Sequence, residues 1–190
     1  VYKRDYSLKP PHNVFTSGEK MLKGAKQLKY RTKYKEEKMA KHFEFYEEDT
    51  ELDSSNGTNY INLPFSSYST CYLKYDKKTK EYKKFEYRKK HLDHKNNKQL
   101  SFKNVIIQLV KETDIDRNGY QHLYLHKRKG EGYYITNGKR MKIKWRKNEE
   151  EGTMCYYDMD GNVLTINPGK TYIAAYPTSR KKLISFKNKE

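Results

Sequence analysis

The sequence predicts a mainly β protein, α+β overall, in which an antiparallel, hairpin-rich sheet domain follows a short helical N-terminal element. Three observations lead to this prediction. Short runs that alternate apolar and polar residues recur beyond residue 57, separated by turn formers. A continuous apolar run at 105–110 has the length and composition of a buried central strand. Apolar residues at helical spacing at 17–30 predict one short helix ahead of them.

The N-terminal element begins with an extended segment, because Pro10 and Pro11 exclude a helix there. Thr16 is expected to cap the helix, and Glu19, three residues later, completes a capping box. The charged residues 31–42 are expected to form a second helical turn or a solvated connector.

Two composition changes predict the domain boundaries. Alternation at 42–46 predicts a strand, and the polar run that ends at Gly57 predicts a linker. The domains are therefore expected at 1–57, 58–178 and, as a basic tail, 179–190.

The expected strands of the main domain alternate with recognisable turns. They are residues 59–64, 70–76, 81–88, 105–110, 119–126, 133–136, 140–145, 154–157, 163–166 and 171–176. Asn137 and Gly138 predict a type I′ hairpin turn, because these residues tolerate two successive positive φ angles. Gly161 and Gly169 mark two further turns.

Composition limits the core and points to polyanionic partners. Of 190 residues 34% are hydrophobic and 19 are tyrosine, so the core is expected to be thin and tyrosine-rich. The net charge of +17 favours nucleic acid, anionic lipid or an anionic wall polymer. An AT-rich coding bias would also produce many Lys, Asn and Tyr residues, and the lysines would then only solvate the surface. Cys71 and Cys155 are either a pair formed outside the cytoplasm or two buried thiols.

No motif establishes a metal site, a cofactor or a catalytic group. The segment from Asp114 to Gly119 resembles half a calcium loop, but Leu125 stands where the bidentate glutamate belongs, so a plain turn is expected. His91 and His94 lack further ligands nearby in the sequence. No nucleophile–base pair emerges from the spacing, which favours binding over catalysis.

Aromatic and cationic residues interleave between residues 72 and 90. On a sheet this pattern is typical of a surface that binds single-stranded nucleic acid. It is also typical of an amphipathic hairpin with one wet face, which is the favoured interpretation.

Short motifs in order along most of the chain carry a family resemblance. They lie at 4–5, 11–17, 75–76, 82, 91–93, 104–106, 130–134, 137–139, 143–147, 157–161 and 167–171. Together they resemble the YerB-like bacterial lipoproteins, a family of unknown function. The resemblance implies an extracytoplasmic protein, anchored to the membrane through a lipidated N-terminal cysteine. This chain starts near the end of the family's N-terminal domain, so the anchor and the missing N-terminal half are expected in a parent protein.

The favoured hypothesis is a non-catalytic binding or assembly module at the outer face of the cytoplasmic membrane. Its expected partner is anionic lipid, wall polymer or an envelope protein. The alternatives are a nucleic-acid-associated basic protein and an enzyme that modifies an envelope polymer. The residues expected to contact a ligand are His12, Asn13, Tyr133, Tyr134, Lys144, Trp145 and Lys170. A turn role for Asn13 and core roles for Tyr134 and Trp145 compete with that prediction.

Overall fold

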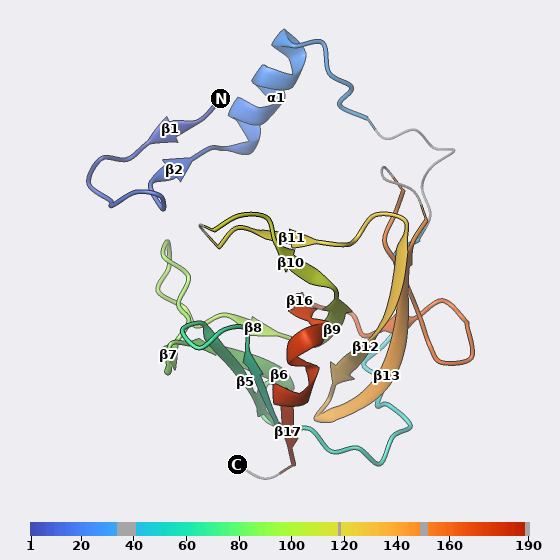
Figure 1. Ribbon diagram of the computed structural model, residues 1–190. Coiled ribbons are helices and arrows are strands. Elements are labelled where there is room, and N and C mark those ends of the chain that lie inside the picture. The colour runs from blue at the N-terminus through green and yellow to red at the C-terminus, as the bar shows by residue number, and fades with distance from the viewer. Residues whose placement is uncertain (34–40, 118, 149–151, 189–190) are drawn as a thin grey trace. The chain divides into compact units, whose positions relative to one another are not determined.

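The computed structural model describes residues 1–33, 41–117, 119–148 and 152–188. The chain forms two compact units, Val1–Met39 and Ala40–Glu190, and each is described by itself. As predicted, the protein is mainly β with largely antiparallel pairing (Figure 1). Within the described ranges, no helix is long and apolar enough to cross a membrane.

The first unit is a small ribbon followed by one helix. Its elements are β1 (Lys3–Arg4), β2 (Val14–Phe15) and α1 (Gly18–Gln27). Ser17, not Thr16, caps the helix, and its hydroxyl accepts a hydrogen bond from the backbone N–H of Lys20. The Thr16 cap prediction is wrong by one residue, because the Thr16 hydroxyl instead donates to the carbonyl of Val1 at 3.0 Å.

The second unit is built on two sheets. The six-stranded sheet contains β17 (Ser185–Lys187), β4 (Tyr60–Pro64), β5 (Thr70–Asp76), β6 (Glu81–Glu86) and β7 (Lys89–Lys90) in that order, with β8 (Ser101–Phe102) also paired to β6. The five-stranded sheet has the order β14 (Cys155–Tyr157), β13 (Lys139–Lys147), β12 (Arg128–Thr136), β9 (Asn104–Val110) and β16 (Thr171–Pro177). Shorter elements are β10 (Glu112–Asp114), β11 (Gln121–Leu123), β3 (Glu44–Phe45), β15 (Thr165–Ile166) and the 3-10 helix η2 (Thr178–Leu183).

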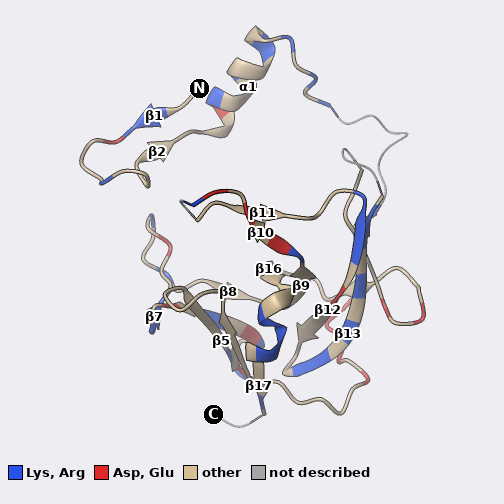
Figure 2. Cartoon of the chain, viewed as in Figure 1, with Lys and Arg blue, Asp and Glu red and all other residues tan. Residues whose placement is uncertain are grey.

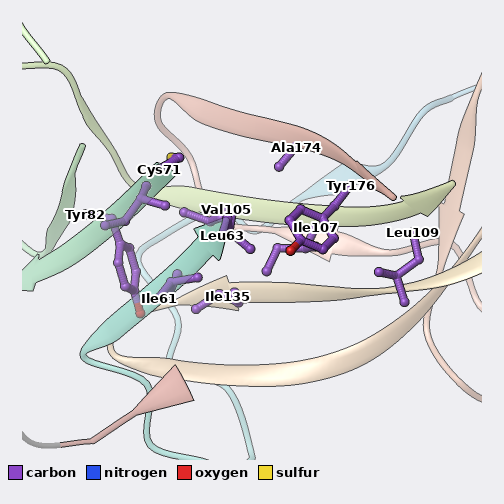
Figure 3. Packing of buried hydrophobic residues seen from close by; sticks show 11 residues of the cluster. Ile61, Leu63, Cys71, Tyr82, Val105, Ile107, Leu109, Ile135, Ala174 and Tyr176 are labelled. Carbon is purple, nitrogen blue, oxygen red and sulfur yellow. The ribbon is translucent and has the colours of Figure 1, made fainter. Parts of the chain in front are cut away.

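The main core lies between these two sheets (Figure 3). Ile61, Leu73 and Tyr82 from the six-stranded sheet pack against Val105 and Ile107 from β9. All seven residues of β9 are buried, which confirms the prediction that 105–110 is a central strand. A strand buried on both faces needs a continuous apolar run, because both rows of side chains leave water.

A second core covers the opposite face of the five-stranded sheet. There Ile143, Trp145 and Tyr156 pack beneath Leu52 and Leu164. Residues 41–57, which the sequence places with the N-terminal element, thus contribute to the second unit.

An ionic cluster fastens this covering segment to the sheet. The Asp49 carboxylate lies 2.6 Å from the Lys103 ammonium and 2.9 Å from that of Lys80, and it accepts a hydrogen bond of 2.7 Å from the Asn137 side chain. Burial by itself would raise the pKa of Asp49, but the hydrogen bonds from Lys103, Asn137 and Lys80 hold it well below its usual range.

Turns were predicted better than strand direction. Asn137 and Gly138 have φ of 49° and 73° at the β12–β13 turn, as a type I′ turn requires, and Gly169 also has a positive φ, of 135°. By contrast, β16 runs parallel to β9, and β15 runs parallel to β3. Hydrophobic alternation contains no information on strand direction, so the sequence missed both parallel pairs.

Candidate functional site

A cation-lined depression lies on the surface where β12, β13 and β14 run side by side. Its volume is about 620 Å³, and it is called the Gly130 hollow below. Its lining consists of Lys129, Gly130, Glu131, Lys144, Trp145, Arg146, Tyr157 and Gly161. Figure 2 shows Lys and Arg recurring along β13 and on η2.

Strand register explains how this lining forms. Lys144 stands directly opposite both Glu131 on β12 and Tyr157 on β14. One step along β13 on the same face, Arg146 stands opposite Lys129 and Cys155. Directly opposed residues in antiparallel strands point to the same face, so these side chains form two adjacent cross-strand rows. Three cations therefore share the face with a single carboxylate.

The cations of the hollow differ in how they are bound. The Lys144 ammonium donates to the Met159 carbonyl at 2.8 Å. Among the residues that the structure describes, no ion pair joins Lys129 or Arg146 to a carboxylate. Both side chains are exposed. Glu131 lies 3.4 Å from Lys181 on η2, so its charge is already partly balanced. The three glutamates at 149–151 lie outside the described residues.

A second depression of about 450 Å³ adjoins the first. The two share Lys129, Gly130, Glu131 and Trp145, and the second adds Lys111, Arg128 and Lys181. The combined surface is strongly cationic and contains Glu131 as the one acidic residue among the lining residues. Closely spaced cations raise the local positive potential, which attracts anions.

Gly130 and Trp145 stand directly opposite each other and pack closely. A Cβ at Gly130 would lie 2.6 Å from the Trp145 indole nitrogen, so this position must stay glycine while the ring is there. The Trp145 side chain is 2% exposed, and its indole N–H donates to the Leu109 carbonyl at 3.0 Å. Trp145 therefore supports the hollow from the second core.

Comparison with known proteins identifies the family. Residues 61–173 match the family described as "Protein of unknown function (DUF3048) C-terminal domain". The chain belongs to this family. The match includes the β12–β13 hairpin and therefore the Gly130 hollow.

The fold resembles that of a solved member of the YerB group. The crystal structure of YerB from Bacillus subtilis matches with a TM-score of 0.74 and 22% identity over 98% of this chain. This chain spans 59% of the length of that protein chain. At this identity the likeness shows a shared fold, and with the family match it confirms the YerB-like resemblance seen in the motifs. No curated protein matches the sequence.

The residues predicted to contact a ligand do not gather in one place. Lys144 and Trp145 line the Gly130 hollow. Tyr133 is half-buried, and its ring packs edge-on against Phe186 at 5.1 Å. Tyr134 is fully buried, and its hydroxyl donates to Asn104 at 2.8 Å. Lys170 is exposed in the loop before β16.

His12 and Asn13 belong to the first unit, Val1–Met39, and are described apart from the hollow. His12 is exposed. Asn13 is 1% exposed, and its side-chain oxygen accepts a hydrogen bond from Arg4 at 3.0 Å. Asn13 thus has a structural role, because its side chain links β1 to the segment directly before β2.

A buried polar cluster was missed by the sequence analysis. Lys84, expected on an amphipathic hairpin, is 6% exposed and lies 2.7 Å from the Glu86 carboxylate and 2.9 Å from Nδ1 of His91. Burial raises the pKa of the nearby Cys71 thiol to about 11, so this thiol stays protonated. None of the depressions described above opens onto this cluster, and its arrangement fits a structural role.

The interleaved aromatics of β5 and β6 stack on one another. The rings of Tyr72 and Phe85 are nearly parallel, at 7° and 4.6 Å between centroids, and Tyr60 continues the row at 5.5 Å from Tyr72. Nearly parallel rings at this distance are stacked, so Tyr72 and Phe85 each cover one face of the other. Bases of a single strand bind to free ring faces, but here Tyr72 and Phe85 cover each other and the Lys187 ammonium lies 5.9 Å from the Tyr60 ring centroid.

Proposed function

We propose that this chain is a non-catalytic binding module of the bacterial cell envelope, in which the Gly130 hollow holds anionic groups of a wall polymer. The observation behind the proposal is the pair Lys129 and Arg146. They stand opposite each other on one face, exposed, with no ion-pair partner in the described part of the chain. Two like charges directly opposite each other destabilise a sheet, and a bound anionic group would remove this repulsion.

The spacing of the cations favours a polymer over a single small anion. Lys142, Lys144 and Arg146 alternate along the exposed face of β13. Alternate residues of a strand are about 7 Å apart, so this row matches an extended chain with regularly repeated anionic groups. The adjoining depression continues the cationic surface through Arg128 and Lys111.

The envelope location is part of the proposal. It is supported by the ordered motifs shared with YerB-like lipoproteins, in which a lipidated N-terminal cysteine anchors the parent protein outside the cytoplasm. The mass and N-terminus of the native gene product, measured in membrane and soluble fractions, test this. A lipid-modified product in the membrane fraction supports the location, and an unmodified cytosolic product refutes it.

Binding to a purified poly(glycerol phosphate) wall polymer tests the hollow directly. The double substitution Lys129→Gln, Arg146→Gln removes two cations but keeps long polar side chains. Loss of two charge-assisted contacts is expected to weaken binding at least tenfold at fixed salt, measured by calorimetry.

The matched control is Lys77→Gln, Lys78→Gln, which removes the same charge from the exposed β5–β6 turn. This control is expected to change the affinity by less than about twofold, because diffuse charge at a distance is screened. Equal losses in both variants would mean generic polycation behaviour and overturn the site. A single-stranded oligonucleotide that binds more tightly than the polymer would favour the nucleic-acid alternative.

A further inference from the structure

The turn between β6 and β7 is a two-residue hairpin with an unfavourable sequence. Glu86 pairs with Lys89, so Tyr87 and Arg88 alone form the turn. Their φ angles are 49° and 62°, both in the left-handed region. Type I′ turns strongly prefer Asn and Gly at these positions, and a bulky residue there is strained. Strained residues cluster at binding and switch sites, so this turn is a place to look for a function.

The strained turn presents an exposed aromatic pair. Tyr87 is 52% exposed and Tyr68, from the β4–β5 loop, is 80% exposed. Their rings contact each other with centroids 5.3 Å apart. The Ser66 hydroxyl accepts hydrogen bonds from the backbone N–H groups of Tyr68 and Ser69, which fixes the loop that carries Tyr68. Two large rings are thus held at the end of the six-stranded sheet.

Cations accompany the two rings. Arg88, Lys89 and Lys90 follow Tyr87 directly, all are exposed, and no ion pair involves them among the described residues. The neighbouring acid, Glu86, is neutralised from within by Lys84 at 2.7 Å. This end of the sheet, called the tyrosine tip (Tyr68, Tyr87, Arg88, Lys89 and Lys90), is therefore both aromatic and positively charged.

We infer that the tyrosine tip docks onto an anionic phospholipid surface. Tyrosine rings with free hydroxyls settle at the level of lipid headgroups, and nearby Lys and Arg are attracted to anionic lipid. Charge complementarity therefore favours this occupant. Two rings and three cations cover on the order of 500 Å², which is well below what a stable protein–protein interface needs. The tip is separate in sequence from the Gly130 hollow, so this inference shares only the envelope location with the proposed function.

The test exploits the strain of the turn. The double substitution Tyr87→Asn, Arg88→Gly installs the preferred type I′ pair, so the urea midpoint of unfolding is expected to rise. The same variant removes one ring and one cation from the tip. Its binding to vesicles of equal parts phosphatidylglycerol and phosphatidylcholine, measured by sedimentation of the full chain, is expected to fall about tenfold. Pure phosphatidylcholine vesicles are expected to bind neither protein.

Two further variants make the result decisive. Tyr68→Ser removes the second ring without touching the turn and is expected to weaken vesicle binding as well. Lys78→Gln removes one exposed cation at the other end of the same sheet and is expected to leave binding within about twofold. Retained binding in Tyr68→Ser, or in a stabilised Tyr87→Asn, Arg88→Gly variant, would overturn the inference. The Lys129→Gln, Arg146→Gln variant should bind vesicles normally, so failure at the hollow and failure at the tip are distinguishable.

Discussion

Replacing Asp49 by asparagine is expected to loosen the segment that covers the second core. Asp49 contacts two ammonium groups, and Lys103, the closer one, is only 8% exposed. The substitution keeps the size of the side chain but leaves the Lys103 charge nearly buried without a counter-ion. Removing one partner of a fully buried pair costs about 3–5 kcal/mol, and exposed pairs contribute below about 1 kcal/mol.

Asp49 lies between these limits, because its side chain is 35% exposed. A loss of about 2 kcal/mol in the free energy of unfolding is therefore expected. For a chain of 190 residues this corresponds to a melting temperature lower by roughly 4–8 °C. Urea unfolding can be followed by fluorescence of Trp145, the single tryptophan, which lies in the core that this segment covers.

The pH dependence gives a second readout of the same cluster. Because the folded pKa of Asp49 is lowered from 3.8, its stabilising contribution is present above pH 3.8 and is lost as the pH falls toward the folded pKa. Asp49→Asn should lack that acid-dependent part. Asp53→Asn, an exposed carboxylate in the same segment, is the matched control. If Asp49→Asn unfolds at the same urea concentration as Asp53→Asn at neutral pH, the ionic cluster does not hold the covering segment.

Two further predictions concern the buried cluster and the thiols. Burial, and then the nearby Lys84 charge, lower the pKa of His91 from 6.5, so the urea midpoint of unfolding should fall as the pH drops below 6.5. The His91→Asn variant should show a weaker fall of the midpoint with pH. An unchanged pH dependence in this variant would contradict the prediction. In the folded protein an anionic disulfide reagent should modify Cys155, which is half-buried and stands opposite Arg146. Cys71 should react only after unfolding, because it is 1% exposed and its pKa is raised to about 11. Equal reaction rates for the two thiols in the folded protein would contradict this prediction.

Parts of the candidate site could be foreseen from local patterns. The β12–β13 hairpin follows from Asn137 and Gly138, and this hairpin brings Lys144 opposite Glu131. The rows on the exposed face then follow from alternation along the strand. The part of the lining that β14 contributes could not be predicted, because pairing between β13 and β14 depends on where the intervening loop returns the chain.

The surroundings of Lys84 show why the rest could not be predicted. Alternation along β6 correctly separates two faces but does not say which one is covered. Lysine is almost always exposed, so composition favours the wrong face. The buried ammonium is tolerated because Glu86 lies 2.7 Å away, Nδ1 of His91 lies 2.9 Å away, and the ring of Tyr172, from a distant part of the chain, packs beside it.

The sequence by itself determined the β-rich class, the central strand β9, the hairpin turns and the family, because these depend on local periodicity, on φ-tolerant residues and on ordered motifs. The tertiary structure alone decided the parallel β9–β16 pair, the ionic cluster around Asp49, the shape of the Gly130 hollow and the aromatic pair at the tyrosine tip. Each of these brings together residues from separate strands or loops, and their contact energies depend on distances and burial that exist only once the chain has folded.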